Sequence, residues 1–527
     1  MSKQSFLHGA IILIIAGLVT KILGFINKIV MARILGPEGM GLYAMAVPIF
    51  VLVVTLTRLG LPVAISKLVA QAEAEGNDQQ VKRILVVSLS ITGTLSLVFT
   101  VLTMFGAKVI SSIFLTDVRA YYPLMAITPV VPIVAVSSVI KGYFQGRQNM
   151  RPSAYSQVIE QVVRISLVAF LAQLLLPLGL EYAAAGAMIS AVLGEAAALF
   201  YLWTTFESRK GKTFRVRKNF FQQLQKGKQT MRDLLRIGLP TTGSGLIGSL
   251  SWTFEAIIVA QSLALAGIAT TTATAQYGLL SGYAIPLVML PMFITTSLSV
   301  SLVPAVSEAL AKKDTALIHR RLYQAFRIAL ICGAPSTIIM YQFAEPIVTV
   351  IYDAPEAAPF LQILAPFFLL LYFQSPLQAT LQGLDMAKAA MMNTLFGAVI
   401  KIGAIYLLAS RPELGIFGAA LAININVCLV TLLHFFSVIK VTKGFSVRLS
   451  DLMKVGLAMS AMGLGGSVIW DGLQKTELPL IWTLVLTLTA VGLLYFIALV
   501  ALKLIGSQDI QRIPLIGTKV APLFPRR

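Results

Sequence analysis

Long apolar stretches with almost no charge recur along this chain of 527 residues. A helix needs about 20 mostly apolar residues to cross the hydrocarbon core of a bilayer. Continuous runs of this length exclude a transmembrane β-barrel, whose strands are short and alternate in polarity. Charged residues make up only 12% of the chain, about half the share of a soluble domain. The sequence therefore predicts an all-α polytopic membrane protein.

We expect about fourteen transmembrane helices, joined mostly by short connections that carry the turn and charged residues. The predicted spans are residues 9–32, 42–65, 84–106, 121–140, 153–176, 183–206, 237–262, 277–303, 326–350, 359–381, 390–409, 415–438, 454–471 and 478–502. The first span is too long for a cleaved signal peptide, and Lys21 and Lys28 interrupt it.

An even number of spans places both termini on the same side of the membrane. Lysine and arginine concentrate on that side, and the opposite loops carry only Arg33, Lys108, Arg119, Arg411 and Lys475. Cytoplasmic loops of membrane proteins are enriched in basic residues. Both termini are therefore predicted to be cytoplasmic. The net charge of +20 then reflects topology, and no binding to nucleic acid is implied.

An internal repeat is visible over 37 positions. Its first copy holds Pro129, Gln145, Gly146, Arg151, Arg164 and Ile165, and each recurs 237 residues later, as Pro366, Gln382, Gly383, Lys388, Lys401 and Ile402. Pro48 and Pro286 match at an offset of 238. The repeat maps spans 1–6 onto spans 7–12. It predicts two parallel six-helix lobes related by a pseudo-twofold axis along the membrane normal, an arrangement typical of transporters.

The repeat also divides the chain into predicted domains. Residues 1–206 form an N-lobe and residues 237–438 a C-lobe, while residues 439–527 hold the last two helices and a cytoplasmic tail. The linker 207–236 contains ten lysines and arginines against Glu207 and Asp233. Two interpretations stay open: a plain cytoplasmic linker, or an interfacial segment that binds anionic lipid and is anchored by Phe214, Phe220 and Phe221.

Basic residues also fall inside the first two spans. Lys21 and Lys28 lie two helical turns apart and share a face, Arg33 follows near the outer end, and Arg58 lies in the second span. No acidic residue precedes Glu38. Charges at the bilayer centre cost at least about 2.5 kcal/mol and usually face a cavity or a partner. The pattern predicts a basic patch that binds an anionic substrate. The alternative is that these side chains extend to the membrane surface.

Further charges lie in later spans. Glu160 and Arg164 are four residues apart, a spacing that lets them pair along one helix. The repeat partner of Arg164 is Lys401, which has no acid four residues earlier and needs another partner or the substrate. Glu195 and Glu255 are single carboxylates. Each is predicted either to bind a coupling ion or proton, or to be the counterion of a basic residue.

Motifs of soluble enzymes are missing from the sequence. We find no Walker P-loop and no nucleophile elbow, and the three histidines His8, His319 and His434 are scattered. Cys332 and Cys428 lie in apolar runs and predict no disulfide framework. We therefore expect neither an enzyme nor a resident metal or cofactor.

Two segments resemble a known family. The opening stretch from Gly17 to Tyr43, GLVTKILGFINKIVMARILGPEGMGLY, and the turn KGYFQGRQNMRP from Lys141 to Pro152 are similar to the polysaccharide-transport branch of the multidrug/oligosaccharidyl-lipid/polysaccharide (MOP) exporter superfamily. Within that branch they resemble the MurJ-like and stage V sporulation protein B-like group. The resemblance covers essentially the whole chain.

The resemblance implies a flippase for undecaprenyl-diphosphate-linked saccharides in the bacterial cytoplasmic membrane. Lipid II for spore cortex or cell wall is the leading substrate. It also implies alternating access, driven by membrane potential or by an ion gradient such as Na⁺ or H⁺. By match to the family, Lys21 and Arg33 fall on basic positions, and Arg58 resembles the second-span arginine. Cell-wall synthases are possible partners.

The chain departs from the family at two places. The span 277–303 holds no lysine or arginine, whereas MurJ-like proteins have a basic residue there. Asn27 stands where MurJ-like proteins have an arginine, and Lys28 follows it. Asn27 is therefore grouped with Glu160, Glu195 and Glu255 as a candidate coupling or counterion position.

Other functions stay open at this point. One is a multidrug/cation antiporter of the same superfamily, which would use carboxylates such as Glu255. Another is a flippase for the precursor of a different surface polysaccharide. A third is a scaffold that recruits cell-wall synthases without transport.

Overall fold

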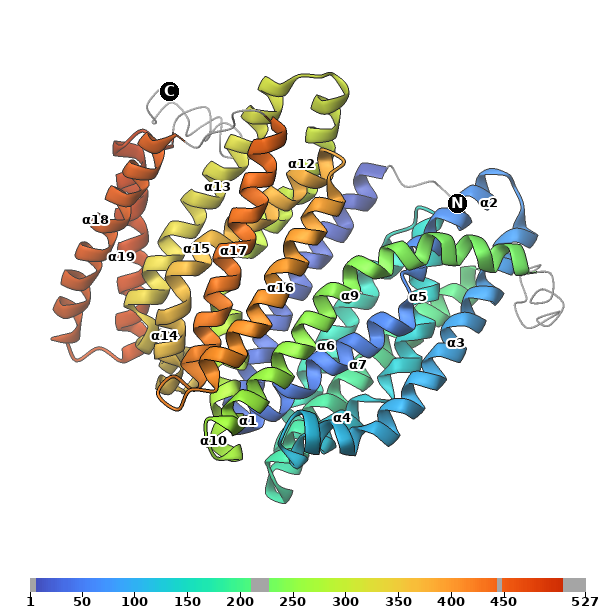
Figure 1. The fold of residues 1–527 in the computed structure, drawn as a ribbon, viewed down its shortest axis with the longest axis horizontal. Coiled ribbons are helices and arrows are strands. Elements are labelled where there is room, and N and C mark those ends of the chain that lie inside the picture. The colour runs from blue at the N-terminus through green and yellow to red at the C-terminus, as the bar shows by residue number, and fades with distance from the viewer. Residues whose placement is uncertain (1–5, 210–226, 443–447, 506–527) are drawn as a thin grey trace. The chain divides into compact units, whose positions relative to one another are not determined.

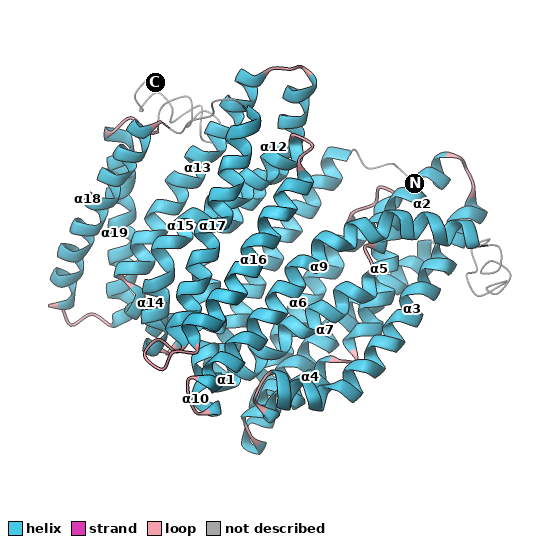
Figure 2. Cartoon of the chain, in the orientation of Figure 1, coloured by secondary structure: helices cyan, strands magenta, loops and turns pink. Residues whose placement is uncertain are grey.

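The fold is described by a computed structural model that covers residues 6–209, 227–442 and 448–505 (Figure 1). These ranges are almost entirely helical and contain no strand (Figure 2). The prediction of an all-α protein is confirmed. Residues 210–226, which include most of the predicted lipid-binding linker and its three phenylalanines, lie outside the described residues, as do 506–527 of the predicted tail.

The helices are α1 (Phe6–Arg58), α2 (Leu61–Ala74), α3 (Asp78–Val109), α4 (Tyr121–Ile127), α5 (Val130–Gly146), α6 (Arg151–Leu175), α7 (Leu180–Arg209), α9 (Lys228–Leu265), α10 (Thr270–Gly278), α11 (Ile285–Val288), α12 (Met292–Ala311), α13 (Thr315–Gln342), α14 (Ala344–Tyr352), α15 (Ala358–Gly383), α16 (Ala387–Ala409), α17 (Ile416–Thr442), α18 (Leu449–Gln474) and α19 (Leu480–Ala501). Shorter turns are the π-helical η1 (Ile110–Phe114) and η4 (Leu279–Ala284), and the 3-10 turns η2 (Val118–Ala120), η3 (Leu176–Leu178) and η5 (Pro355–Ala357).

Thirteen helical segments of the described chain are long and apolar enough to cross a membrane. The first, Ile15–Ala74, contains the first two predicted spans, because α1 continues through a kink at Gly36. Gly36 has a φ of 65° and precedes Pro37, a backbone conformation that glycine adopts without a Cβ clash. We call residues 15–35 and 37–58 the first and second limbs of α1. The predicted total of about fourteen spans stays a prediction.

The eighth predicted span, residues 277–303, is not one continuous helix. α10 ends at Gly278, η4 and α11 follow, and α12 begins only at Met292. Pro286 and Pro291 lie in this stretch and lack the backbone N–H that a continuous helical ladder needs. The segment long enough to cross a membrane here is Met292–Ala311.

Contacts divide the chain into two units. The first comprises residues 1–282 with 409–416, and the second comprises 283–408 with 417–527. α9 and α10 therefore belong with the first unit, although the repeat assigns residues 237–438 to the C-lobe. The cause is close packing on the second limb of α1. Thr253 of α9 donates a hydrogen bond to the Pro48 carbonyl at 3.0 Å, and a Cβ on Gly41 would lie 1.9 Å from the Thr274 carbonyl of α10.

The sequence repeat has structural counterparts 237 residues apart. Asn77 caps the start of α3 by accepting a hydrogen bond from the backbone N–H three residues on, at 2.9 Å. Asp314 caps α13 in the same way at the same distance. The loops after α5 and α15 each contain a non-glycine residue in the left-handed region, Gln148 with φ 55° and Asp385 with φ 59°. The two halves therefore share the same type of helix cap and the same left-handed residue in the loop.

The helix packing is duplicated as well. A Cβ on Gly146 would lie 2.8 Å from the Cβ of Val69, and a Cβ on Gly383 would lie 2.8 Å from the Cβ of Val306. Two separate hydrophobic cores surround these contacts, and four members correspond at the same offset: Ile65, Val69, Ala72 and Val81 in one, and Leu302, Val306, Ala309 and Ile318 in the other. These matches support the predicted duplication.

Valine at either glycine is expected to destabilise the protein. Gly146→Val and Gly383→Val would each force α5 off α2 or α15 off α12, and overpacking of this kind costs about 1–3 kcal/mol. Unfolding of the purified protein in denaturant measures the loss. Gly403→Val is the matched control, because a Cβ there meets nothing within 4 Å. Losses no larger than that of the control would contradict the packing described here.

Candidate functional site

Five charged side chains gather in the first unit, on four helices that belong to candidate membrane spans. We call them the buried ion cluster: Arg58 at the end of α1, Lys141 on α5, Glu160 and Arg164 on α6, and Glu195 on α7. α6 packs against α1 and α7, and α5 packs against α7. A Cβ on Gly194 would lie 2.7 Å from the Glu160 carbonyl oxygen. This close approach of α7 to α6 brings their charged side chains together.

Two ion pairs form within the cluster. The Arg164 Nη2 lies 2.6 Å from the Glu160 Oε1, so the pairing predicted from their spacing is present. The Lys141 Nζ lies 3.4 Å from the Glu195 Oε1, and these side chains are only 16% and 6% exposed. Glu160 and Glu195 also interact electrostatically with each other. Together with Arg58, the cluster holds three basic side chains and two carboxyl groups.

Arg58 adds the third cation. It interacts electrostatically with both Glu195 and Glu160. The Nε atoms of Arg58 and Arg164 are buried and have no hydrogen-bond partner among the described residues. A buried donor left unpaired costs about 1–3 kcal/mol. Two such guanidinium donors in a positively charged site are chemically suited to the oxygen atoms of an anion.

The first limb of α1 carries the other predicted cations of this unit. Lys21, Lys28 and Arg33 are exposed side chains there. Between the two lysines, a Cβ on Gly24 would lie 3.9 Å from the Gln161 side-chain oxygen of α6, so the limb passes the helix that holds Glu160 and Arg164. The three cations therefore line a limb that runs beside α6.

Asn27 lies on the same limb but is buried. Its Nδ2 donates to the sulfur of Met31 at 3.3 Å, while its Oδ1 has no hydrogen-bond partner in the described part of the chain. An amide in this position offers a neutral acceptor on a limb that otherwise carries three cations.

Two predicted residues lie apart from the buried ion cluster. Glu255 on α9 is 8% exposed and interacts electrostatically with Tyr277 of α10. Lys401 on α16 is 7% exposed and belongs to the second unit. There is a structural reason why Lys401 has a glycine and not an acid four residues earlier. A Cβ on Gly397 would lie 2.2 Å from Val430 of α17. No side chain larger than hydrogen fits where the first repeat has Glu160.

The sequence analysis missed Lys141. The predicted fourth span ends at residue 140, which placed Lys141 in a cytoplasmic turn. The structure extends α5 to Gly146, so that Lys141 points to Glu195 from inside the helix. The signal was available: Gly142, Tyr143 and Phe144 continue the apolar run and are buried.

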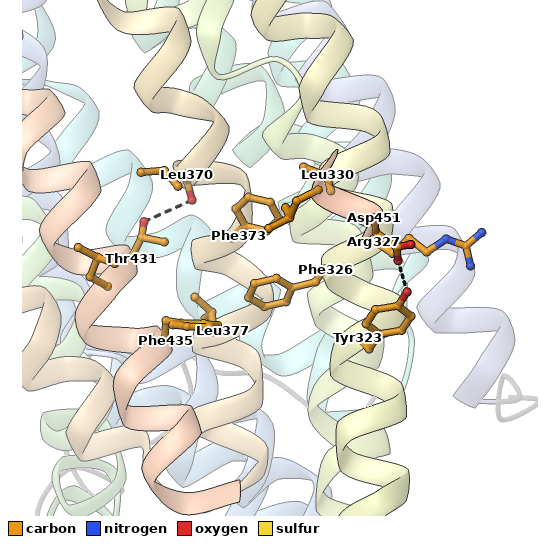
Figure 3. Close-up of a pocket in the computed structure, with 12 residues that line it drawn as sticks. Tyr323, Phe326, Arg327, Leu330, Leu370, Phe373, Leu377, Thr431, Phe435 and Asp451 are labelled. Carbon is orange, nitrogen blue, oxygen red and sulfur yellow. Dashed lines mark hydrogen bonds between the residues drawn. The ribbon is translucent and has the colours of Figure 1, made fainter. Parts of the chain in front are cut away.

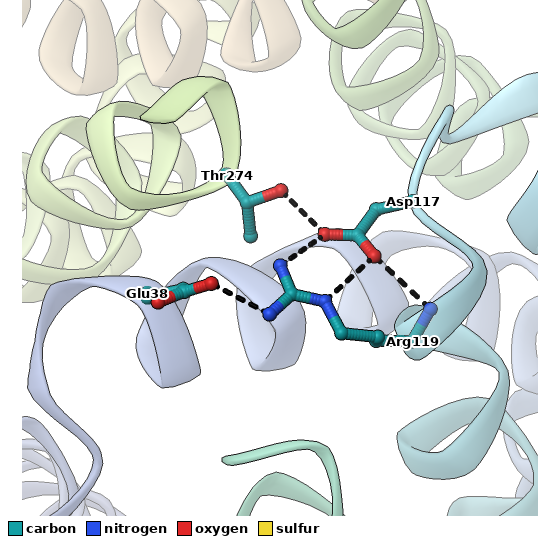
Figure 4. A network of polar contacts seen from close by, with 4 residues as sticks. All are labelled: Glu38, Asp117, Arg119 and Thr274. Carbon is teal, nitrogen blue, oxygen red and sulfur yellow. Dashed lines mark hydrogen bonds and ion pairs between the residues drawn. The ribbon is translucent and has the colours of Figure 1, made fainter. Parts of the chain in front are cut away.

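A second polar network joins three segments of the first unit (Figure 4). Arg119 in η2 donates from Nη1 to Glu38 at 2.6 Å and from Nη2 and Nε to the carboxylate of Asp117 at 2.9 and 3.1 Å. Thr274 of α10 donates to the same carboxylate at 2.8 Å. The network ties the kink of α1 to η2 and α10. Burial opposes ionisation of Asp117, but the hydrogen bonds from Arg119 and Thr274 outweigh it and hold the pKa of Asp117 below its ordinary value.

Asp117→Asn is expected to destabilise the protein by about 2 kcal/mol at neutral pH, because hydrogen bonds to charged groups are worth about that much. Since the folded-state pKa is depressed, this stabilisation is complete above the unfolded pKa of about 3.9 and disappears as the pH falls through the folded value. Thermal unfolding between pH 3 and 7 measures the difference from wild type. Glu413→Gln, at an exposed carboxylate, is the control. A difference between Asp117→Asn and wild type that persists unchanged below pH 3.5 would contradict this account.

Two family models match this chain. The model for "Polysaccharide biosynthesis protein" matches residues 6–310, more than half of the chain. The chain belongs to the polysaccharide biosynthesis protein family. The MatE family model matches residues 280–407.

Relatives in this family extend over nearly the full length. Stage V sporulation protein B of Bacillus subtilis (strain 168) is 52% identical over 523 residues, which cover 98% of this chain and 99% of that protein. Lipid II flippase MurJ of the same organism is 24% identical over 467 residues, 85% of each chain. The resemblance predicted from Gly17–Tyr43 and the turn after Lys141 is confirmed.

Solved structures share the fold. A structure of lipid II flippase MurJ in an inward closed conformation matches with a TM-score of 0.68 and 17% identity, covering 92% of this chain and 97% of that one. An inward-facing multidrug resistance MATE family transporter of the MOP superfamily matches with a TM-score of 0.67 and 18% identity, covering 80% and 95%. This member of the family is therefore a multi-pass membrane protein with a MATE-like and MurJ-like fold.

Proposed function

We propose that the protein is a flippase that moves a lipid-linked saccharide diphosphate across the bacterial cytoplasmic membrane by alternating access. The leading substrate is an undecaprenyl-diphosphate-linked precursor of the lipid II type, used for spore cortex or cell wall. The relatives named above support this class of substrate. The observation that carries the proposal is the buried ion cluster, in which two guanidinium Nε donors have no acceptor among the residues that the structure describes.

The chemistry of a diphosphate fits such a site. Its oxygens are acceptors for charge-assisted hydrogen bonds, and arginine offers planar pairs of donors to them. Arg58, Arg164 and Lys141 would bind the diphosphate within the cluster, while Lys21, Lys28 and Arg33 on α1 guide it along the first limb. Lys401 stays a predicted substrate-binding residue.

The carboxylates have a separate role in this proposal. Glu160 and Glu195 hold Arg164 and Lys141 when no substrate is bound, and so lower the cost of intramembrane cations. Either carboxylate, with Asn27 or Glu255, is also a candidate position for a coupling ion, Na⁺ or H⁺. In this proposal both termini are cytoplasmic, and the protein performs transport and no chemical conversion.

A flipping assay tests the function. The protein is reconstituted in liposomes with fluorescent lipid II in one leaflet, and the loss of accessible fluorescence is followed with and without a membrane potential. We expect transport by wild type in vesicles that contain no ATP. If lipid II stays in place while an undecaprenyl-diphosphate carrying another glycan moves, the substrate assignment is wrong and the flippase class stands. If neither moves, the flippase proposal fails.

The second candidate is a multidrug/cation antiporter, which the MatE match at residues 280–407 and the buried Glu255 favour. Such a transporter would bind its cation at a carboxylate. Proton-driven efflux of a cationic dye from the same liposomes, abolished in Glu255→Gln, would support it. Lipid II transport that is unaffected by Glu255→Gln supports the flippase instead.

A further inference from the structure

An apolar pocket of about 210 Å³ lies in the second unit and shares no lining residue with the buried ion cluster (Figure 3). Four helices line it: α13, α15, α17 and α18. Phe326, Phe373 and Phe435 form an aromatic wall, with the first two rings stacked at 4.9 Å between centroids. α18 has no counterpart in the repeat, and the pocket forms where this appended helix lies beside α13, α15 and α17.

The walls of the pocket offer a ligand almost nothing polar. Thr431 faces it, but its hydroxyl is already bonded to the Val427 carbonyl at 2.7 Å and to the Leu370 carbonyl at 3.3 Å. Leu432 and Leu452, also in the lining, are 47% and 42% exposed. Because α17 and α18 are long and apolar enough to cross a membrane, these exposed side chains would contact lipid, and the pocket would open toward the bilayer. Hydrocarbon is the ligand that fits such a surface.

Charge borders the pocket at one end. Arg327 is part of the lining and donates to the Leu504 carbonyl, and Figure 3 shows its guanidinium directed away from the aromatic wall. The Arg448 guanidinium lies 5.1 Å from the ring centre of Tyr323, whose hydroxyl donates to Asp451. Asp451 is the single acid of the lining.

More cations stand on the same helix ends. Near the start of α13, the end of α17 and the start of α18 lie Arg320, Arg321, Lys440 and Lys454. The sequence predicts that these ends face the cytoplasm. A basic rim at the membrane surface beside an apolar pocket matches the two parts of an anionic phospholipid, whose phosphate attracts lysine and arginine.

We propose that this pocket binds one acyl chain of an anionic phospholipid from the predicted cytoplasmic leaflet, with its phosphate held at Arg327 and Arg448. The bound lipid fills the space between α18 and the helices of the repeat, and it fastens α18 to α13, α15 and α17. The site is separate from the proposed flippase function, because it shares no residue with the buried ion cluster.

Native mass spectrometry of the full chain in detergent tests the proposal. Phosphatidylglycerol and phosphatidylethanolamine with identical acyl chains are titrated separately, and the first bound lipid is quantified. We expect phosphatidylglycerol to be retained preferentially. Arg448→Gln should weaken its binding about fivefold, the effect of one basic residue near an anionic surface. Leu432→Trp, which fills the mouth with an indole, should remove the preferential site.

Two matched controls use exposed residues, one directly after the end of α18 and one on α18 itself. Lys475→Gln removes a cation at the opposite end of the helix, and Leu464→Trp adds an indole at a side chain that is 74% exposed and outside the pocket. Both should bind lipid as wild type does. Equal retention of the two phospholipids, or equal losses in controls and site variants, would overturn the proposal. A polyprenyl phosphate that displaces phosphatidylglycerol from wild type but not from Leu432→Trp would assign the pocket to a prenyl chain instead.

Discussion

Arg58→Gln is expected to slow lipid II flipping by about tenfold to a hundredfold. A hydrogen bond from a cation to an anionic group is worth about 1.5–3 kcal/mol, and its loss at the substrate lowers the rate by that factor. Arg58 is the most informative residue of the buried ion cluster to substitute, since its Nε is buried and has no acceptor within the described ranges of the chain. Glutamine keeps a polar side chain there but removes the charge. Initial rates in the liposome assay measure the effect.

Two further variants show whether the effect of Arg58→Gln comes from the lost charge at the cluster. Arg411→Gln removes an exposed cation from a loop of the first unit and should flip lipid II at the wild-type rate. Arg58→Lys keeps the charge and should recover part of the lost rate, which a purely structural role would not require. A wild-type rate in Arg58→Gln, with unchanged thermal stability, would remove the buried ion cluster from the substrate path.

Local patterns in the sequence predicted much of this structure. Apolar runs about 20 residues long located the membrane helices, and the spacing of Glu160 and Arg164 predicted their ion pair, because both depend on a single helix. The sequence repeat also corresponds to repeated structure, including the equivalent helix caps at Asn77 and Asp314. Each of these features is encoded within a few turns of chain.

The buried ion cluster could be predicted only in part. Its members come from four helices, and their meeting depends on how α5, α6 and α7 are rotated and shifted against one another. Gly194 permits the close approach of α7 to α6, but a glycine in an apolar run does not reveal which helix it faces. Lys141 was missed for a related reason, because the end of an apolar run did not mark the end of α5.

The break in the eighth predicted span has another cause. Hydropathy continues through residues 277–303, yet Pro286 and Pro291 interrupt the backbone ladder. Average apolarity and backbone hydrogen bonding are different properties, and only the second decides where a helix breaks. The same distinction explains α1, where a kink at Gly36 joins two predicted spans in one helix.

Glu195→Leu is expected to destabilise the protein by about 3–5 kcal/mol, because removal of one partner leaves Lys141 as an uncompensated intramembrane charge. Lys141→Met in the same background should recover most of this loss, since an apolar pair of similar size replaces a buried ion pair at little cost. Denaturant unfolding of the two single variants and the double variant gives the coupling.

The exposed pair of Lys312 and Glu308 provides the matched cycle. Both side chains are more than 60% exposed, and water and salt screen such pairs. The cycle of Lys312→Met and Glu308→Leu should show no measurable coupling. If the Lys141–Glu195 cycle also showed no coupling energy, the two residues would not be partners in the folded protein. Arg58 would then be the counterion of Glu195. The difference between the two coupling energies therefore measures the effect of burial on an ion pair. Burial is also the property that makes a cluster of cations inside a membrane helix bundle suited to a diphosphate.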